Sequence, residues 1–275
     1  MDKSNNEKKP HCGRSIVTAV LFVFFAAVFV FSLWQLISAA KDYQIGSESY
    51  DSLAQTMVTK KAPEAPSPVP APVKQPELPE QAPAQPREPL LDVDFEALLE
   101  MNPHTVAWIY SENEEINYPV VQGSDNDYYL DHLFDGTQNK NGAIFMDCRN
   151  SPDLTHRNTL IYGHNMGNHT MFASLVNYGD QAYYDENPVL ILETPEASYY
   201  LEAFSGYTTK SVSEAYRQDL AEDETYVGFL ERIRENSDFE SDVEVGVQDR
   251  IVTLSTCSYR FDNARYVLHC KLVCA

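Results

Sequence analysis

Basic side chains are scarce in this sequence, which has 20 lysines and arginines against 41 aspartates and glutamates. The shortage lies in residues 90–275, where 11 basic residues face 32 acidic ones, so this part carries the whole net charge of −21. Such a surface repels phosphate backbones and anionic lipid headgroups. We therefore expect no nucleic-acid partner.

Cysteine is also rare, with five in the chain, and no two have the Cys-x-x-Cys spacing typical of zinc sites. We expect no metal and no cofactor. Cys270 and Cys274, if they share one strand, lie about 13 Å apart, and a disulfide tolerates roughly 7 Å. Mostly reduced thiols are expected, while a disulfide that involves Cys148 stays open.

Charge is absent from residues 16–40, a run of 25 mostly apolar positions. As a helix this run would span about 37 Å, enough to cross a bilayer. The four basic residues of segment 1–15 favour a cytoplasmic N-terminus with the remainder outside. The alternative is a signal peptide cleaved near residues 38–40, but the apolar core of a signal peptide is usually about 7–15 residues long. We expect a single-pass membrane anchor, and both interpretations export the rest.

A polar and proline-rich linker is expected over residues 41–89. Its part from 63 to 89 has ten prolines in 27 positions, a composition that cannot build a core. In the polyproline II conformation this part would reach up to about 80 Å. The composition predicts a stalk that carries one domain, residues 90–275.

Short strand-like runs dominate residues 90–275, among them GAIFMD, NTLIYGH, PVLILET and SYYLEAFSGY, each bounded by Gly, Asn, Asp or Pro. Short helices are expected in LDVDFEALLEMNP and over residues 221–235, where acidic residues come early and arginines late. No internal repeat is visible. The pattern predicts a mostly β domain, a closed or nearly closed barrel with a few peripheral helices.

Chemistry-bearing residues stand at the ends of three expected strands. In TLSTCSYRFDNARYVLHC one apolar run ends at Cys257 and the next begins at Arg265, so a hairpin would make the two neighbours. A thiol beside a fixed positive charge can attack a carbonyl and stabilise the negative charge that develops. His164, just after NTLIY, is the candidate proton partner, although on spacing alone a turn histidine without a catalytic role is the alternative.

These residues carry a resemblance to a known family. The stretch TLSTCSYRFDNARYVLHCKL resembles the catalytic hairpin of sortases, in which TLxTC is followed by an arginine on the next strand. NTLIYGHNM is similar to the segment that bears the sortase histidine. WIYSENEEINYPVVQGSDNDYYLDHLFDG and GAIFMDCRN resemble class B sortases in particular. The resemblance covers roughly residues 90–275 and implies a closed sortase-type β-barrel.

The resemblance also implies residue roles. Cys257 would be the nucleophile, His164 the general acid and Arg265 the group that binds the substrate or the oxyanion. The backbone beside Thr256 would supply a further donor.

Two features of the loop between the last two strands qualify this assignment. Arg260 is a rival for the arginine role, but Arg265 matches the family position. Some class B sortases have an acidic residue two positions after the cysteine, where this chain has Tyr259.

The implied function is that of a membrane-anchored cysteine transpeptidase of a Gram-positive cell surface, with its catalytic domain extracellular. It would cleave a C-terminal sorting motif of exported proteins through a thioacyl-enzyme and join them to an amine of a cell-wall peptide or peptidoglycan precursor. The alternatives are a pilus-polymerising sortase, an exported cysteine peptidase with water as acceptor, and a stalked binding module without catalysis.

Overall fold

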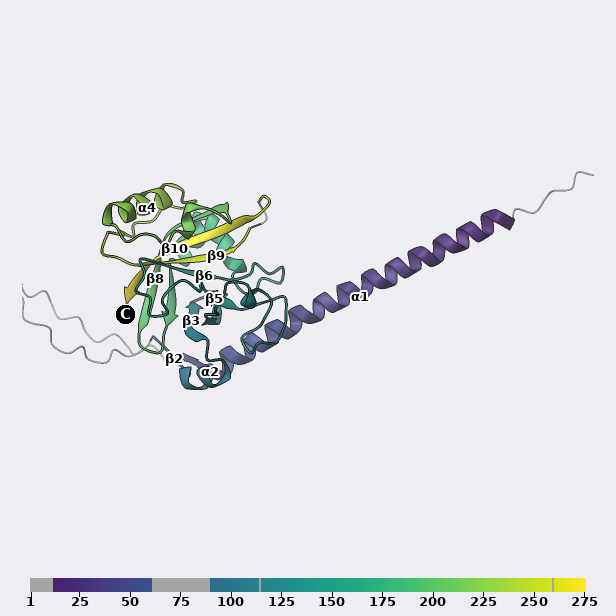
Figure 1. Ribbon diagram of the computed structural model, residues 1–275, viewed down its shortest axis with the longest axis horizontal. Helices are drawn as coiled ribbons and strands as arrows, with labels where there is room; N and C mark the ends of the chain where they lie inside the picture. The colour runs from purple at the N-terminus through teal and green to yellow at the C-terminus, as the bar shows by residue number, and fades with distance from the viewer. Residues whose placement is uncertain (1–11, 61–89, 114, 259) are drawn as a thin grey trace, which may run out of the picture. The chain divides into compact units, whose positions relative to one another are not determined.

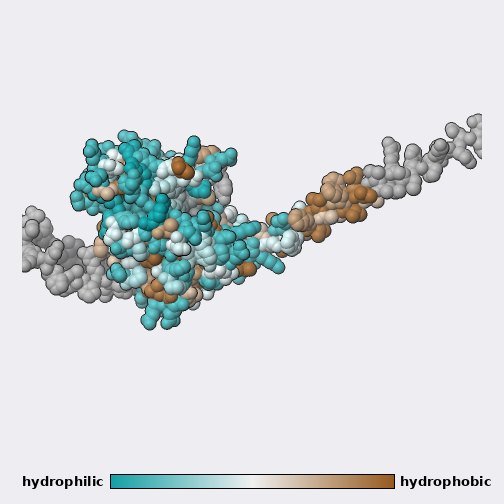
Figure 2. Space-filling model, viewed as in Figure 1, coloured by the Kyte–Doolittle hydropathy of each residue, from teal (hydrophilic) through white to brown (hydrophobic). Residues whose placement is uncertain are grey.

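The computed structural model describes residues 12–60, 90–113, 115–258 and 260–275, and two compact units make up the chain, Met1–Ile45 and Gly46–Ala275 (Figure 1). The described part of the first unit is helical and belongs to α1 (Cys12–Met57). The large apolar side chains between residues 20 and 37 are exposed and form a continuous hydrophobic band (Figure 2). α1 is long and apolar enough to cross a membrane, as expected for residues 16–40.

The second unit contains a closed barrel of eight strands in the order β10-β8-β7-β3-β4-β5-β6-β9. The expected mostly β barrel is therefore confirmed. The strands are β3 (Thr105–Ser111), β4 (Asn117–Val121), β5 (Ile144–Met146), β6 (Asn158–Tyr162), β7 (Val189–Glu193), β8 (Ser198–Lys210), β9 (Ile251–Cys257) and β10 (Ala264–Cys274).

Short helices lie at the periphery of the barrel. Asp94 caps α2 with a carboxylate that accepts a hydrogen bond from the Ala97 amide. α4 has acidic residues in its first turn and arginines in its last, and it packs against Phe204 of β8 and Val267 of β10. The helices of this unit are α2 (Phe95–Met101), α3 (Gln181–Glu186) and α4 (Asp223–Glu235), with 3₁₀ turns η1 (Tyr128–Leu130), η2 (Ala173–Gly179) and η3 (Glu214–Tyr216).

The first part of the expected linker lies inside the barrel unit. α1 continues through residues 46–57, and β1 (Val58–Lys60) pairs with β2 (Leu91–Val93) in a separate two-stranded sheet. The physical reason is an apolar stripe in an otherwise polar stretch, in which Tyr50 and Leu53 are buried and Met57 packs against the core. The proline-rich residues 63–89 lie outside the described residues.

His269 is a fully buried polar residue in β10. Its Nδ1 lies 2.8 Å from Oγ1 of Thr253, and that hydroxyl donates to Oδ1 of Asn158 at 2.7 Å. Because the hydroxyl has one proton, the Nδ1–H of His269 must donate to it. Nε2 is left as an acceptor with no partner among the described residues. Burial lowers the pKa of His269 to about 3, so the ring stays neutral in the folded chain.

Because this ring is buried and neutral, we expect the free energy of unfolding to fall in acid. The unfolded chain takes up the proton near pH 6.5, and the folded chain only near pH 3, so stability falls as the pH drops through this window. The slope contributed by one such proton is at most about 1.4 kcal/mol per pH unit. In His269→Asn an amide replaces the Nδ1–H donor, and the free energy of unfolding in urea should depend less on pH between about 6 and 4. Equal slopes for the two proteins would contradict a neutral, buried imidazole.

Candidate active site

Strand pairing brings three chain segments to one rim of the barrel. β6 runs parallel to β9, with Tyr162 opposite Ser255, so the two strands end on the same side. β10 runs antiparallel to β9 and places Arg265 opposite Cys257, which confirms the expected hairpin. His164 follows β6 by two residues and reaches the same rim.

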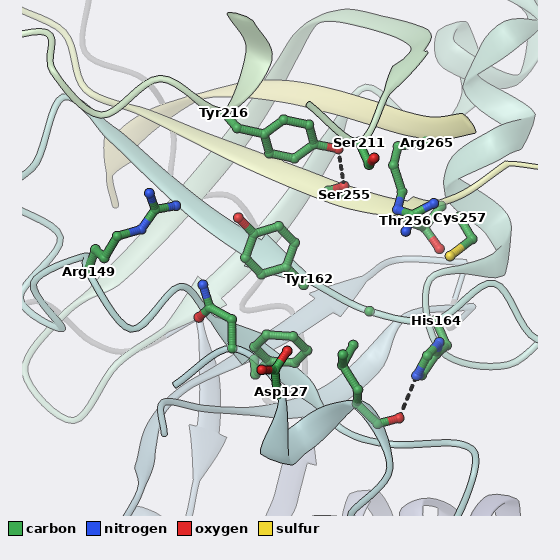
Figure 3. Close-up of a pocket in the computed structure, with 14 residues that line it drawn as sticks. Asp127, Arg149, Tyr162, His164, Ser211, Tyr216, Ser255, Thr256, Cys257 and Arg265 are labelled. Atoms are coloured by element: carbon green, nitrogen blue, oxygen red, sulfur yellow. Dashed lines mark hydrogen bonds between the residues drawn. The ribbon is translucent and has the colours of Figure 1, made fainter. Parts of the chain in front are cut away.

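The rim surrounds a cavity of about 580 Å³ (Figure 3). His164, Cys257 and Arg265 lie together at one end of it, and Cys257 points into the space between the other two side chains. His164, Thr256, Cys257 and Arg265 therefore line a single cavity, and the rival Arg260 does not. The lining residues are Asn126, Asp127, Leu130, Phe145, Arg149, Tyr162, Gly163, His164, Ser211, Tyr216, Ser255, Thr256, Cys257 and Arg265.

The imidazole of His164 is held by a backbone carbonyl. Its Nε2 lies 2.6 Å from the oxygen of Leu130, and since that oxygen can only accept, Nε2 carries a proton. In the neutral ring Nδ1 is therefore the free base, and this nitrogen lies on the edge turned toward Cys257 (Figure 3). The carbonyl of His164 also accepts a hydrogen bond from the Phe172 amide at 2.9 Å.

Cys257 is the partly exposed last residue of β9. Its carbonyl accepts a hydrogen bond from Nδ2 of Asn165 at 2.9 Å, and Asn165 follows His164 directly. This bond joins the loop of the histidine to the strand of the cysteine. Thr256, beside the thiol, is buried, and its Oγ1 has no partner among the described residues.

The two arginines near the hairpin point to different places. Arg265 lines the cavity, and its Nη1 donates to the carbonyl of Ala264 at 3.0 Å. Arg260 is turned toward Asp238, 3.9 Å away, and its side chain is 58% exposed. Of this pair, Arg265 is therefore the one that faces the thiol. Tyr259, where some class B sortases have an acid, lies outside the described residues.

A polar network forms another part of the cavity wall. Arg149 binds the buried carboxylate of Asp147 through both Nε and Nη2, and the hydroxyl of Tyr162 donates to the same carboxylate at 2.9 Å. Burial alone would raise the pKa of Asp147, but these donors outweigh it and lower that pKa to about 2. The hydroxyl of Tyr216 lies 2.9 Å from Oγ of Ser255. These hydrogen bonds fix the polar side chains of Arg149, Tyr162 and Tyr216 in the cavity wall.

Sequence reasoning missed this network and Asn165. One signal was available for Tyr162 and Ser255, because each precedes a candidate residue by two positions and side chains two apart in a strand share a face. No comparable signal points to Tyr216, the last residue of η3, which lies between β8 and α4.

Known proteins resemble this chain in both sequence and fold. A family model of the sortase domain matches residues 110–273. Sortase B of Staphylococcus aureus is 37% identical over 181 residues, which are 65% of this chain and 74% of the relative. The structure of a Staphylococcus aureus sortase B-substrate complex superimposes with a TM-score of 0.63 at 37% identity, covering 66% of this chain and 85% of the other. For sortase B from Bacillus anthracis the TM-score is 0.69 at 33% identity, covering 86% and 99%.

Proposed function

Given that this chain belongs to the sortase family, and within it to class B, we propose that it is a cysteine transpeptidase that acts on exported proteins. The observation that supports this most directly is the meeting of a thiol, an imidazole and a guanidinium at one end of one cavity. The roles below are assigned to Cys257, His164 and Arg265 on that basis.

The first half-reaction forms a thioacyl-enzyme. The thiol of Cys257 gives its proton to Nδ1 of His164, and the sulfur attacks a backbone carbonyl of the sorting motif. The guanidinium of Arg265 stabilises the oxyanion, which is a task for a group that stays charged at any working pH. The carbon–nitrogen bond then breaks, and the imidazolium returns the proton to the leaving amine.

The second half-reaction uses an amine of a cell-wall peptide in place of water. The amine attacks the thioester carbonyl, Nδ1 of His164 takes up its proton, and the sulfur leaves to be protonated again. A new amide bond joins the exported protein to the wall peptide. Asp127 and the acidic barrel unit suit the approach of a cationic amine.

The place of this reaction is the outer face of the cell membrane. The apolar part of α1 would be the anchor, and the basic residues before it favour a cytoplasmic N-terminus. The catalytic unit then works where exported proteins and wall peptides meet.

The proposal is tested by measuring how the thioester divides between hydrolysis by water and transfer to an amine. The resemblance to class B sortases implies a sorting motif of the Asn-Pro type. The detergent-solubilised full chain is incubated with an internally quenched peptide that contains such a motif, with and without triglycine or a peptide that has a free lysine amine. We expect a thioacyl adduct on Cys257 by mass spectrometry and an amide product that grows with amine concentration as the acid product falls. A constant yield of acid at every amine concentration would identify a cysteine peptidase. If no adduct forms and Cys257→Ala leaves the cell surface unchanged, the chain is a binding module.

A further inference from the structure

Residues 46–57 of α1 touch the two loops that hold His164. The hydroxyl of Tyr50, which is 3% exposed, donates to the carbonyl of Gly142 at 2.7 Å. Oγ of Ser47 accepts a hydrogen bond from Asn168 at 3.2 Å. One contact reaches the segment before β5, and the other reaches the loop that follows His164.

The first of these contacts ends directly beside the catalytic ring. Gly142 has a φ of +58°, in the left-handed region that favours glycine. A Cβ at this position would lie 2.8 Å from the carbonyl oxygen of Leu130 and 3.0 Å from Cδ2 of His164. The backbone at Gly142 thus packs against both the ring and the oxygen that accepts its Nε2–H. The hydroxyl of Tyr50 donates to the carbonyl of this same residue.

The ring of Tyr50 braces the second loop as well. It meets Tyr118 edge to face, with 5.4 Å between the ring centroids. The hydroxyl of Tyr118 accepts a hydrogen bond from the amide of Met171 at 2.9 Å. The next amide, of Phe172, donates to the carbonyl of His164. Both supports of the histidine therefore lead back to one tyrosine.

We propose that residues 46–57, through Tyr50, position His164 for proton transfer. Tyr50 is a positioning residue, since it acts through Gly142 and Tyr118 and does not line the cavity. The C-terminal part of α1, residues 46–57, thus supports the catalytic histidine. This inference rests on the proton-transfer role proposed for His164.

Tyr50→Phe in the full chain tests the inference, because it removes the hydroxyl and keeps the ring. Loss of one positioning hydrogen bond should lower kcat about three- to tenfold and leave KM nearly unchanged. Amide exchange should become faster in peptides that cover residues 129–143 and 164–172, and this readout does not depend on turnover.

Tyr226→Phe is the matched control. Its hydroxyl is also bound to backbone carbonyls, but at Arg157 and Asp249, toward the end of β6 opposite to His164. If the wild type is active and Tyr50→Phe has the same kcat as Tyr226→Phe and the wild type, the positioning role is overturned and the proposed function is not. Unchanged amide exchange in the two peptides of Tyr50→Phe would have the same meaning. A wild type without any cleavage or transfer would overturn the proposed function and the positioning role together.

Gly46→Ala perturbs the same loop from the helix and removes no hydrogen bond. A Cβ at position 46 would collide with the side chain of Asn141, whose buried side-chain amide has no partner among the described residues. Alanine favours a helix, so the helix itself is not weakened. We expect a fall in kcat and faster exchange over residues 129–143, as in Tyr50→Phe. Wild-type values of both would count against the inference.

Discussion

We expect Cys257→Ala to abolish both cleavage and transfer, with kcat lowered by at least about four orders of magnitude. The reason is chemical, because the proposed reaction passes through a covalent bond to this sulfur and no other group at the rim can replace it. The measurement is turnover of the quenched peptide together with mass spectrometry of the enzyme, in which the thioacyl adduct should be absent. Binding of the peptide, followed by fluorescence anisotropy, should change little.

Cys148→Ala is the control for this prediction. Cys148 is also a partly exposed free thiol, and it precedes Arg149 of the cavity wall, but it does not line the cavity itself. Its loss should leave turnover within about twofold of the wild type, as for other substitutions away from the reacting atoms. Turnover by Cys257→Ala, or an adduct on Cys148, would remove the basis of the proposed mechanism.

Arg265→Ala is expected to lower kcat by about two to three orders of magnitude, the usual effect of removing an oxyanion donor. Arg265→Lys should recover part of this loss, because it keeps the charge but not the planar fork of donors. These substitutions should change kcat more than KM, because the guanidinium stabilises charge that develops only in the transition state. Steady-state kinetics with the quenched peptide measure the split.

Arg260→Ala supplies the comparison within the same hairpin. Its guanidinium lies 3.9 Å from Asp238 and is largely exposed, so we expect little change in kcat or KM. If Arg260→Ala is the more damaging substitution, the loop arginine and not Arg265 serves the reaction. If neither matters, the oxyanion is stabilised by backbone donors alone.

Most of the barrel is predictable from local patterns. Runs such as NTLIY and RIVTLSTC alternate or stay apolar over strand length and are bounded by polar or turn-forming residues, so their strands appear where expected. The pairing of β1 with β2 was not foreseen, because its partners are separated by residues 61–90 and each strand has three residues. The docking of residues 46–57 was missed because its few apolar side chains are diluted by polar ones.

The site residues also differ in how far the sequence predicts them. Cys257, Arg265 and His164 stand at strand ends, so their meeting follows from strand order and one hairpin. The side-chain amide of Asn158 donates to the carbonyls of Ala215 and Arg217, and these bonds help to hold η3 and its Tyr216 on the barrel. Contacts of this kind join residues that are far apart in the chain and leave no periodic trace in the sequence.

The small sheet of β1 and β2 has a consequence for the proline-rich segment between them. Lys60 and Leu91 are paired neighbours, so residues 61–89 leave and rejoin the folded unit at a common base. By the chain entropy of loop closure, a twofold change in the length of a connection alters the free energy by only about 0.6 kcal/mol. Insertions, deletions and repeats can therefore accumulate there during evolution without shifting the register of any barrel strand.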